Sequence, residues 1–183
     1  MSAAFDDVFG FELLQLGTWG AARELLAQCR VRHQTIAAAR PGAGVDLISL
    51  PTQLPVASTS LDAVLLPHTL ESAEDPHAVL LEADRVLAGE GHLLILGFNP
   101  RSSWGWRARG PLRPLSEGRV RDWLTLLRYQ IAPSRHYLNT WPLPWPAGGW
   151  LLKARKRLYG VTPIRPRKRE RRAMLGSALE PSA

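Results

Sequence analysis

Short apolar runs recur along the chain and alternate with segments in which apolar residues have helical spacing. Such runs, bounded by turn-forming residues, are typical of strands. The run at residues 92–98 is apolar at nearly every position, which is typical of a strand covered by helices on both faces. The predicted strands cover residues 11–16, 31–38, 45–50, 61–67, 92–98, 129–138 and 150–156.

Three segments between these runs predict helices. Residues 21–30 consist of good helix formers. Asp75 is a favourable N-cap with Pro76 at the first helical position, and Gly89 is the expected C-terminal cap. The apolar stripe of this helix comprises Val79, Leu80, Ala83, Val86 and Leu87. Ser116 is expected to begin a third helix, with Val120, Trp123, Leu124 and Leu127 on one face.

The alternation of strands and helices indicates an α/β domain with a doubly wound sheet. In such sheets ligands bind beyond the carboxyl ends of the strands. The segments that follow the predicted strands are therefore candidate ligand contacts. These segments are residues 17–20, 38–40, 50–54, 67–71 and 97–101.

The composition describes an ordinary folded protein. The chain has 183 residues, of which 45% are hydrophobic and 21% are charged, so a wholly disordered chain is excluded. No apolar stretch reaches the roughly 18 residues of a membrane-spanning helix, and the N-terminus carries acids where a signal peptide is positive. We therefore expect a cytoplasmic protein. The single cysteine, Cys29, excludes an internal disulfide framework and a cysteine-clustered zinc site.

Positive charge is concentrated near the C-terminus. The chain carries +7 overall, but residues 153–172 alone carry +9 and the rest carries −2. We expect a domain at residues 1–157 and a basic, flexible tail at residues 158–183. The tail is interpreted first as a solvated segment, because no aromatic residues interleave its arginines for base stacking. A nucleic-acid partner for residues 153–172 is the alternative.

Residues 54–100 carry the most specific motif. The stretch resembles that of the class I S-adenosylmethionine-dependent methyltransferases, in the subgroup called methyltransferase type 11. The segment at residues 98–107 is similar to a bacterial subgroup whose members are mostly uncharacterised. The resemblance extends over about residues 11–157 and implies a Rossmann-like, mostly parallel sheet with an antiparallel edge strand. The matching residues are Leu54, Pro55, Asp62, Leu70, Asp75, Pro76, Leu80, Glu82, Arg85, Val86, Leu87, Glu90, Gly91 and the strand at 93–96.

The resemblance implies S-adenosylmethionine as cofactor and a cleft at the ends of the first, third and fourth strands. Around the first strand the expected cofactor contacts are Gln15, Gly17, Trp19 and Gly20. Here Gln15 replaces the family's acid, and Trp19 stands where the family usually has glycine. The N-terminus is also short for the helix that commonly precedes the first strand.

The cleft is expected to continue at Leu50, Pro51, Pro67 and His68. No acid follows the second strand at residues 37–40, where the family holds the ribose hydroxyls with a carboxylate. His68 is a candidate substrate-binding residue or base, and the alternative is a histidine satisfied by Glu71 three residues on. No catalytic residue is assigned, because the cofactor itself carries the reactive methyl group.

The leading hypothesis is methyl transfer from S-adenosylmethionine to an unidentified acceptor. The second is a catalytically inactive binding module on the same fold, and the third is a nucleic-acid-associated protein that acts through the basic tail. No metal site is expected, because the acids and histidines at residues 68–77 lack a ligand spacing.

Overall fold

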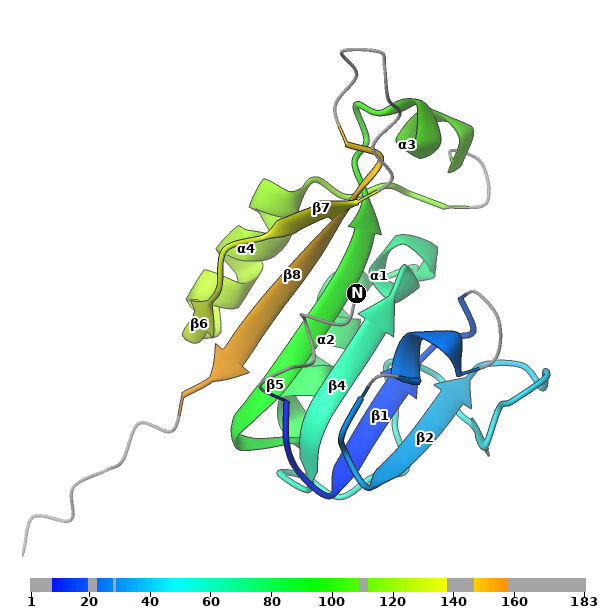
Figure 1. Cartoon of the computed structure of the whole chain (residues 1–183), viewed down its shortest axis with the longest axis vertical. Helices are drawn as coiled ribbons and strands as arrows, with labels where there is room; N and C mark the ends of the chain where they lie inside the picture. Colours follow the sequence, from blue (N-terminus) through cyan, green and yellow to red (C-terminus); the bar gives the residue numbers. More distant parts are fainter. Residues whose placement is uncertain (1–7, 20–22, 28, 109–111, 138–146, 158–183) are drawn as a thin grey trace, which may run out of the picture.

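A mixed eight-stranded sheet forms the centre of the computed structural model, which describes residues 8–19, 23–27, 29–108, 112–137 and 147–157 (Figure 1). The strand order is β3-β2-β1-β4-β5-β8-β6, and β7 pairs with β8. The strands are β1 (Glu12–Leu16), β2 (His33–Ala38), β3 (Leu47–Ile48), β4 (Leu61–Pro67), β5 (Leu87–Phe98), β6 (Tyr129–Ile131), β7 (Arg135–Tyr137) and β8 (Gly149–Lys156).

The strands β1 to β5 pair in parallel, whereas β8 runs antiparallel to β5, β6 and β7. The predicted α/β class, the mostly parallel sheet and its antiparallel edge are thus confirmed. Two predicted strands differ in extent. The strand expected at residues 45–50 is limited to β3, and the one expected at 129–138 is divided into β6 and β7.

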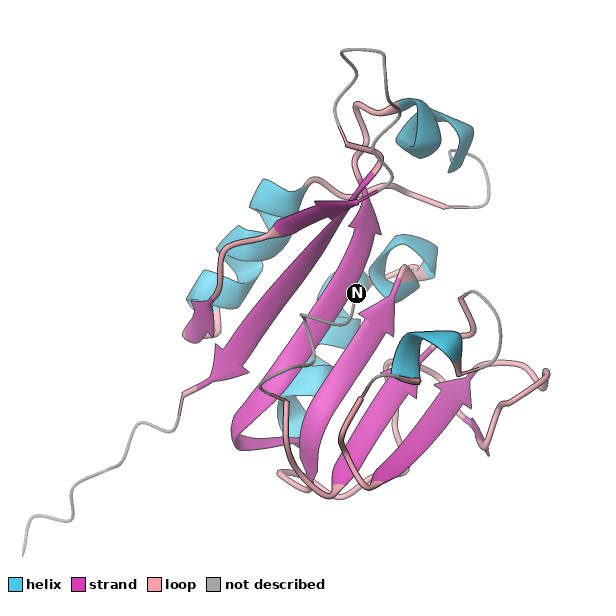
Figure 2. Ribbon diagram, in the orientation of Figure 1, coloured by secondary structure: helices cyan, strands magenta, loops and turns pink. Residues whose placement is uncertain are grey.

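The two faces of the sheet are covered differently. Helices α2 (Pro76–Val86) and α4 (Glu117–Leu126) lie against one face, where they bury the larger apolar core (Figure 2). On the other face the described cover is the 3-10 turn η2 (Glu24–Leu26), beneath which a smaller core forms. Successive β4 residues alternate between the cores, because side chains alternate across a strand: Val64 belongs to the larger and Leu65 to the smaller.

Helix α2 begins as the sequence predicts. The Asp75 side chain accepts hydrogen bonds from the backbone N–H groups of His77 and Ala78, at 2.9 and 3.0 Å. The expected C-terminal cap at Gly89 is wrong: the helix ends at Val86, and Gly89 lies inside β5. The chain enters the strand directly, and the pairing of β5 with β4 shifts register between Leu61 and Ala63.

The helix predicted at residues 21–30 is also wrong. Arg23 has a left-handed backbone (φ 63°), and residues 24–26 form only a 3-10 turn. The Arg23 guanidinium binds the Asp46 carboxylate at 2.6 Å and the carbonyl of Gln34 at 3.0 Å. These contacts to β2 and its following loop override the helical propensity of the local sequence.

Several residues of the 54–100 motif hold the fold together. Asp62 accepts hydrogen bonds from the N–H groups of Phe11 and Glu12 at the start of β1. Glu82 accepts from the N–H of Leu54 at 2.7 Å and pairs with Arg85 at 2.8 Å. Arg85 also donates to the carbonyl of Leu54 at 3.1 Å. The motif is therefore architectural, since it fixes the loop before β4 against α2.

Candidate functional site

A pocket of about 590 Å³ lies at the carboxyl ends of β1, β2 and β4. This is the edge where parallel α/β sheets bind ligands, and the volume is within the ~300–1,000 Å³ typical of ligand sites. The short helix α1 (Thr69–Ser72) follows β4 at this edge (Figure 1). The described lining residues are Gly17, Thr18, Trp19, Ala38, Ala39, Arg40, Pro41, Pro67, His68, Thr69, Ser72 and Leu112.

Four of the predicted cofactor contacts line this pocket, namely Gly17, Trp19, Pro67 and His68. Gln15 is buried in β1, and its amide donates to the carbonyl of Gly17 at 2.9 Å. The structure does not bring Leu50 and Pro51 to the pocket, because the chain turns back there through a bridge between Leu50 and Gln53. Gly20 lies outside the described residues.

Gly17 gives the pocket an open backbone. Its φ of +96° is rarely adopted by residues with a side chain, and an added Cβ would lie 3.2 Å from Thr69 Oγ1. The Thr69 hydroxyl donates to the carbonyl of Leu16 and thereby ties α1 to the end of β1. Steric constraints at this turn therefore explain why glycine occupies position 17.

His68 is the centre of a buried hydrogen-bond network. Its Nδ1 lies 2.6 Å from Glu71 Oε2, and its Nε2 lies 3.2 Å from the hydroxyl of Tyr137. The second Glu71 oxygen accepts from the N–H of Phe98 at 2.7 Å. Both ring nitrogens of His68 are therefore engaged. The interpretation of His68 as a histidine satisfied by Glu71 agrees with this geometry, although the ring also lines the pocket.

Tyr137 joins the network from the antiparallel edge. Its hydroxyl lies 3.3 Å from the carbonyl of Gly97. Burial, together with the nearby Glu71 charge, raises the pKa of the Tyr137 hydroxyl far above its ordinary value. The phenol consequently keeps its proton throughout the physiological range and acts as a neutral hydrogen-bonding group.

Three aromatic rings meet beside the pocket. The rings of His68 and Phe98 are stacked with centroids 4.0 Å apart, and Trp19 lies 4.4 Å from His68 and 5.5 Å from Phe98. The backbone of His68 is left-handed (φ 56°), which turns the residue toward this cluster at the end of β4. Trp19 is 41% exposed, so its indole is accessible to a ligand.

Tyr137 was not among the predicted site residues, and Phe98 was included only as part of the candidate segment at residues 97–101. Phe98 is the last residue of the predicted strand at 92–98, and its position at the carboxyl edge was an available signal. Tyr137 has no local signal, because it meets His68 only through the pairing of β7 with β8.

S-adenosylmethionine, which the fold family implies, fits most of this pocket. The open backbone at Gly17 and the accessible indole of Trp19 suit a flat adenine ring. Gln15, which is buried in β1 and is not among the lining residues, has an oxygen, Oε1, that finds no hydrogen-bond partner in the described chain. Such an oxygen suits an amino-group donor. At the end of β2 the described lining has Ala38, Ala39 and Arg40 in place of a ribose-binding acid.

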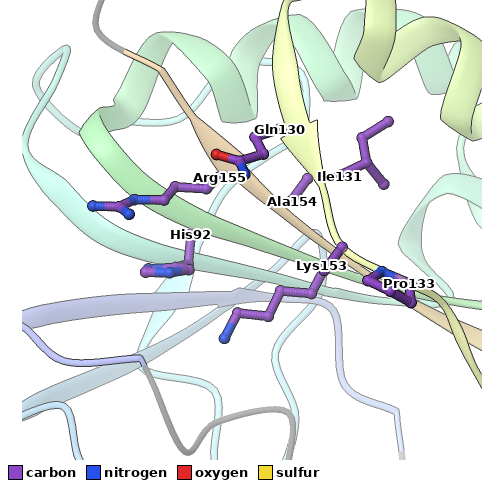
Figure 3. Close-up of a pocket in the computed structure, with 8 residues that line it drawn as sticks. His92, Gln130, Ile131, Pro133, Lys153, Ala154 and Arg155 are labelled. Atoms are coloured by element: carbon purple, nitrogen blue, oxygen red, sulfur yellow. The ribbon is translucent and has the colours of Figure 1, made fainter.

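A different pocket lies on the antiparallel side of the sheet, toward the amino end of β5 (Figure 3). It has a volume of about 370 Å³, and His92, Gln130, Lys153 and Arg155 line it. Arg155 pairs with Glu90 at 3.0 Å. None of the predicted cofactor residues that the structure describes lines it. The predicted basic tail at residues 158–183 is outside the described part of the chain, so its flexibility and any nucleic-acid role stay predictions.

The described residues also lack two other kinds of feature. No cluster of three or more histidine, cysteine or acidic side chains suitable for a metal ion occurs among them. None of the helices in the described ranges is long and apolar enough to cross a membrane.

Comparisons with known proteins agree with the fold. Residues 21–95 match the family described as "Methyltransferase domain". The chain is 39% identical over 160 residues to the uncharacterised protein YafS of Escherichia coli strain K12, a match that covers 82% of this chain. The chain spans 65% of the length of that relative.

Solved structures with the same fold are distant in sequence. A methyltransferase of Thermotoga maritima, described as a possible histamine N-methyltransferase, has 16% identity and a TM-score of 0.63, covering 80% of this chain and 82% of that one. A methyltransferase of Mesorhizobium loti has 14% identity and a TM-score of 0.63, covering 84% and 94%. The [4+2]-cyclase SpnF has 16% identity and a TM-score of 0.66, covering 86% and 78%.

Proposed function

From the premise that this chain carries a methyltransferase domain and the class I S-adenosylmethionine-dependent methyltransferase fold, we propose that it binds that cofactor and methylates an acceptor. The observation that supports the proposal best is the pocket at the carboxyl edge, where Gly17, Trp19, Pro67 and His68 converge. The acceptor is unidentified, and a distant fold match does not supply it, since one such match is named as a cyclase.

When bound, S-adenosylmethionine supplies a methyl group on a positively charged sulfur. The part of the protein is to bind, orient and exclude water. Gly17 leaves the backbone open to the ligand, and the ring of Trp19 offers a face that attracts a cation or stacks on adenine. Glu71 and Tyr137 hold the ring of His68 in the pocket wall.

Calorimetric titration of the full chain with S-adenosylmethionine and with S-adenosylhomocysteine tests the proposal. Saturable binding of both ligands is the expected result. The absence of binding at millimolar concentration contradicts it. Gly17→Val is a matched variant, because it closes the backbone at a pocket-lining position; circular dichroism shows whether it folds.

A non-catalytic binding module is the second candidate. Two observations favour it. The indole of Trp19 packs against the ring of His68, and the described lining residues include no carboxylate. Crystals soaked with S-adenosylmethionine distinguish the two. An unmoved Trp19 with no bound cofactor supports the module, whereas turnover on any acceptor refutes it.

A further inference from the structure

A second hollow at the carboxyl edge has no part in the cofactor pocket. It has a volume of about 490 Å³ and lies on the segment that leaves β5 and forms α3 (Ser103–Ala108). Figure 1 shows α3 beyond the end of β5. The described residues that line the hollow are Pro100, Arg101, Ser102, Ser103, Trp106 and Arg107.

A short stretch of chain connects the lining of the hollow to the lining of the cofactor pocket. Phe98 stacks on His68, which lines the cofactor pocket, and Pro100 follows Phe98 by two residues. The turn between them is fixed, because the Ser102 hydroxyl donates to the carbonyl of Asn99 at 2.7 Å. An added Cβ at Gly105 would lie 2.0 Å from that carbonyl oxygen, so α3 packs tightly on the turn.

The chemistry of the hollow combines apolar surface with positive charge. Trp106 is 71% exposed, so its indole is available to cover the apolar body of a ligand. The exposed tryptophans of the described chain are Trp19, Trp104 and Trp106, and all follow the carboxyl ends of β1 or β5.

Two cations flank this surface. Arg101 and Arg107 are exposed, and within the described ranges neither guanidinium makes an ion pair or a side-chain hydrogen bond. The lining that the structure describes contains no carboxylate. A guanidinium binds carboxylates through paired hydrogen bonds, and an indole covers an apolar body.

The cofactor pocket supplies an independent argument about the acceptor. A hydroxyl acceptor must lose a proton during methyl transfer, and this calls for a general base, whereas a neutral amine attacks through its lone pair and loses its proton to solvent afterwards. Among the described residues that line the cofactor pocket, only His68 is a candidate base, and Glu71 and Tyr137 engage both its ring nitrogens. An acceptor that is already an anion needs no base.

We propose that the hollow at Arg101, Trp106 and Arg107 binds an organic carboxylate with an apolar body, and that this carboxylate is the methyl acceptor. The inference rests on the proposed function, because that function supplies the methyl donor. A carboxylate oxygen forms the new O–CH3 bond while the S–CH3 bond of the donor breaks. The bonding electron pair stays on sulfur, the product is a methyl ester, and no proton moves.

The first experiment measures binding of 2-naphthoate and its neutral analogue 2-naphthamide to the full chain by calorimetry, in the presence of S-adenosylhomocysteine. Naphthoate is expected to bind at least about tenfold more tightly than the amide. The double variant Arg101→Gln/Arg107→Gln should abolish that preference, and Trp106→Ala should weaken both ligands. Arg32→Gln, at an exposed arginine just before β2, is the matched control and should change neither.

Equal affinity for the acid and the amide, or an unchanged preference in the double variant, overturns the carboxylate site. The binding of S-adenosylhomocysteine alone is recorded separately. If that ligand binds and naphthoate does not, the inference fails while the proposed function stands. If naphthoate binds in an arginine-dependent way and S-adenosylhomocysteine does not, the proposed function fails and the acceptor role fails with it.

The second experiment tests transfer directly. The chain is incubated with S-adenosylmethionine and a series of carboxylates from benzoate to dodecanoate, and methyl esters are detected by mass spectrometry. The expected rate is independent of pH between 6 and 9, since the acceptor is ionised throughout. Methylation of hydroxyl or amine analogues without any ester overturns the assignment, as does a series in which no ester forms.

Discussion

Nδ1 of His68 lies 2.6 Å from Glu71 Oε2, and both side chains are almost completely buried. A buried hydrogen bond to a carboxylate is stronger than a hydrogen bond between two neutral groups. If one partner is removed, the other stays buried without a hydrogen bond, and this costs its desolvation free energy. The second Glu71 oxygen meets the N–H of Phe98, so one carboxylate joins α1 to β4 and β5. We therefore regard Glu71 as the residue that positions His68 in the pocket wall.

Replacing Glu71 with glutamine should lower the free energy of unfolding by about 1.5–3 kcal/mol, the typical loss of a hydrogen bond to a charged group. Urea unfolding at pH 7 measures the change. Glu74→Gln is the control, because Glu74 is exposed three residues further on. Equal stability of the Glu71 variant and the wild type contradicts the positioning role.

A carboxylate introduced after β2 should strengthen cofactor binding. Ala39 is exposed and lines the pocket where the family holds the ribose with an acid. Ala39→Asp is expected to tighten S-adenosylhomocysteine about tenfold or more, since one charge-assisted hydrogen bond contributes about 1.5–3 kcal/mol. Calorimetry measures the affinity.

Ala39→Asn serves as the neutral counterpart of that variant and should give a smaller gain. If the aspartate variant binds no more tightly than the wild type, ribose does not lie at the end of β2. The cofactor would then require another placement in the pocket.

The elements of the fold were largely predictable because their signals are local. Asp75 and Pro76 mark the start of α2, and the capping bonds that they predict are present. The helix expected at residues 21–30 failed for the opposite reason. Arg23 adopts a left-handed backbone that its contacts with Asp46 and Gln34 hold in place. Local helix propensity does not include such contacts between separate segments, so it predicts the wrong structure here.

The candidate site was predictable only in part. Gly17, Trp19 and His68 converge because parallel strands end at the same edge of the sheet. Leu50 lies away from the pocket because the short β3 ends in a tight turn. Tyr137 contacts His68 across 69 residues of sequence, because β7 pairs with β8 at the antiparallel edge. The periodicity of the sequence does not predict which strands pair with each other.

Trp19 is either a contact for the cofactor or an obstruction in its pocket, and a variant distinguishes these two roles. If its indole covers bound ligand, Trp19→Ala should weaken S-adenosylmethionine binding about tenfold, consistent with a cation–π or stacking contribution of about 1–2 kcal/mol. Calorimetry on the full chain measures the change. Trp104→Ala is the control, because Trp104 is exposed and is not among the described lining residues of either hollow. Tighter binding by the Trp19 variant indicates instead that the indole occupies the space of the ligand.

Glu82 should make the stability of the protein depend on acid pH. Hydrogen bonds from Arg85 and from the N–H of Leu54 hold the pKa of the Glu82 carboxyl below its ordinary value of 4.5. A lowered folded-state pKa means that the ionised form stabilises the native state. This contribution is fully present above the unfolded-state pKa and is lost as the pH falls through the lower folded-state pKa.

Glu82→Gln should therefore destabilise the protein at pH 7 by about 1.5–3 kcal/mol, since the hydrogen bonds to a charged carboxylate are lost. The difference between the variant and the wild type should shrink as the pH falls through the lowered folded-state pKa, where the wild-type carboxyl takes up its proton. Urea unfolding across this range measures it, with the exposed Glu24→Gln as control. A difference that stays constant as the pH is lowered from 7 until the protein unfolds shows that the packing of the side chain, and not its charge, holds the loop at Leu54 against α2.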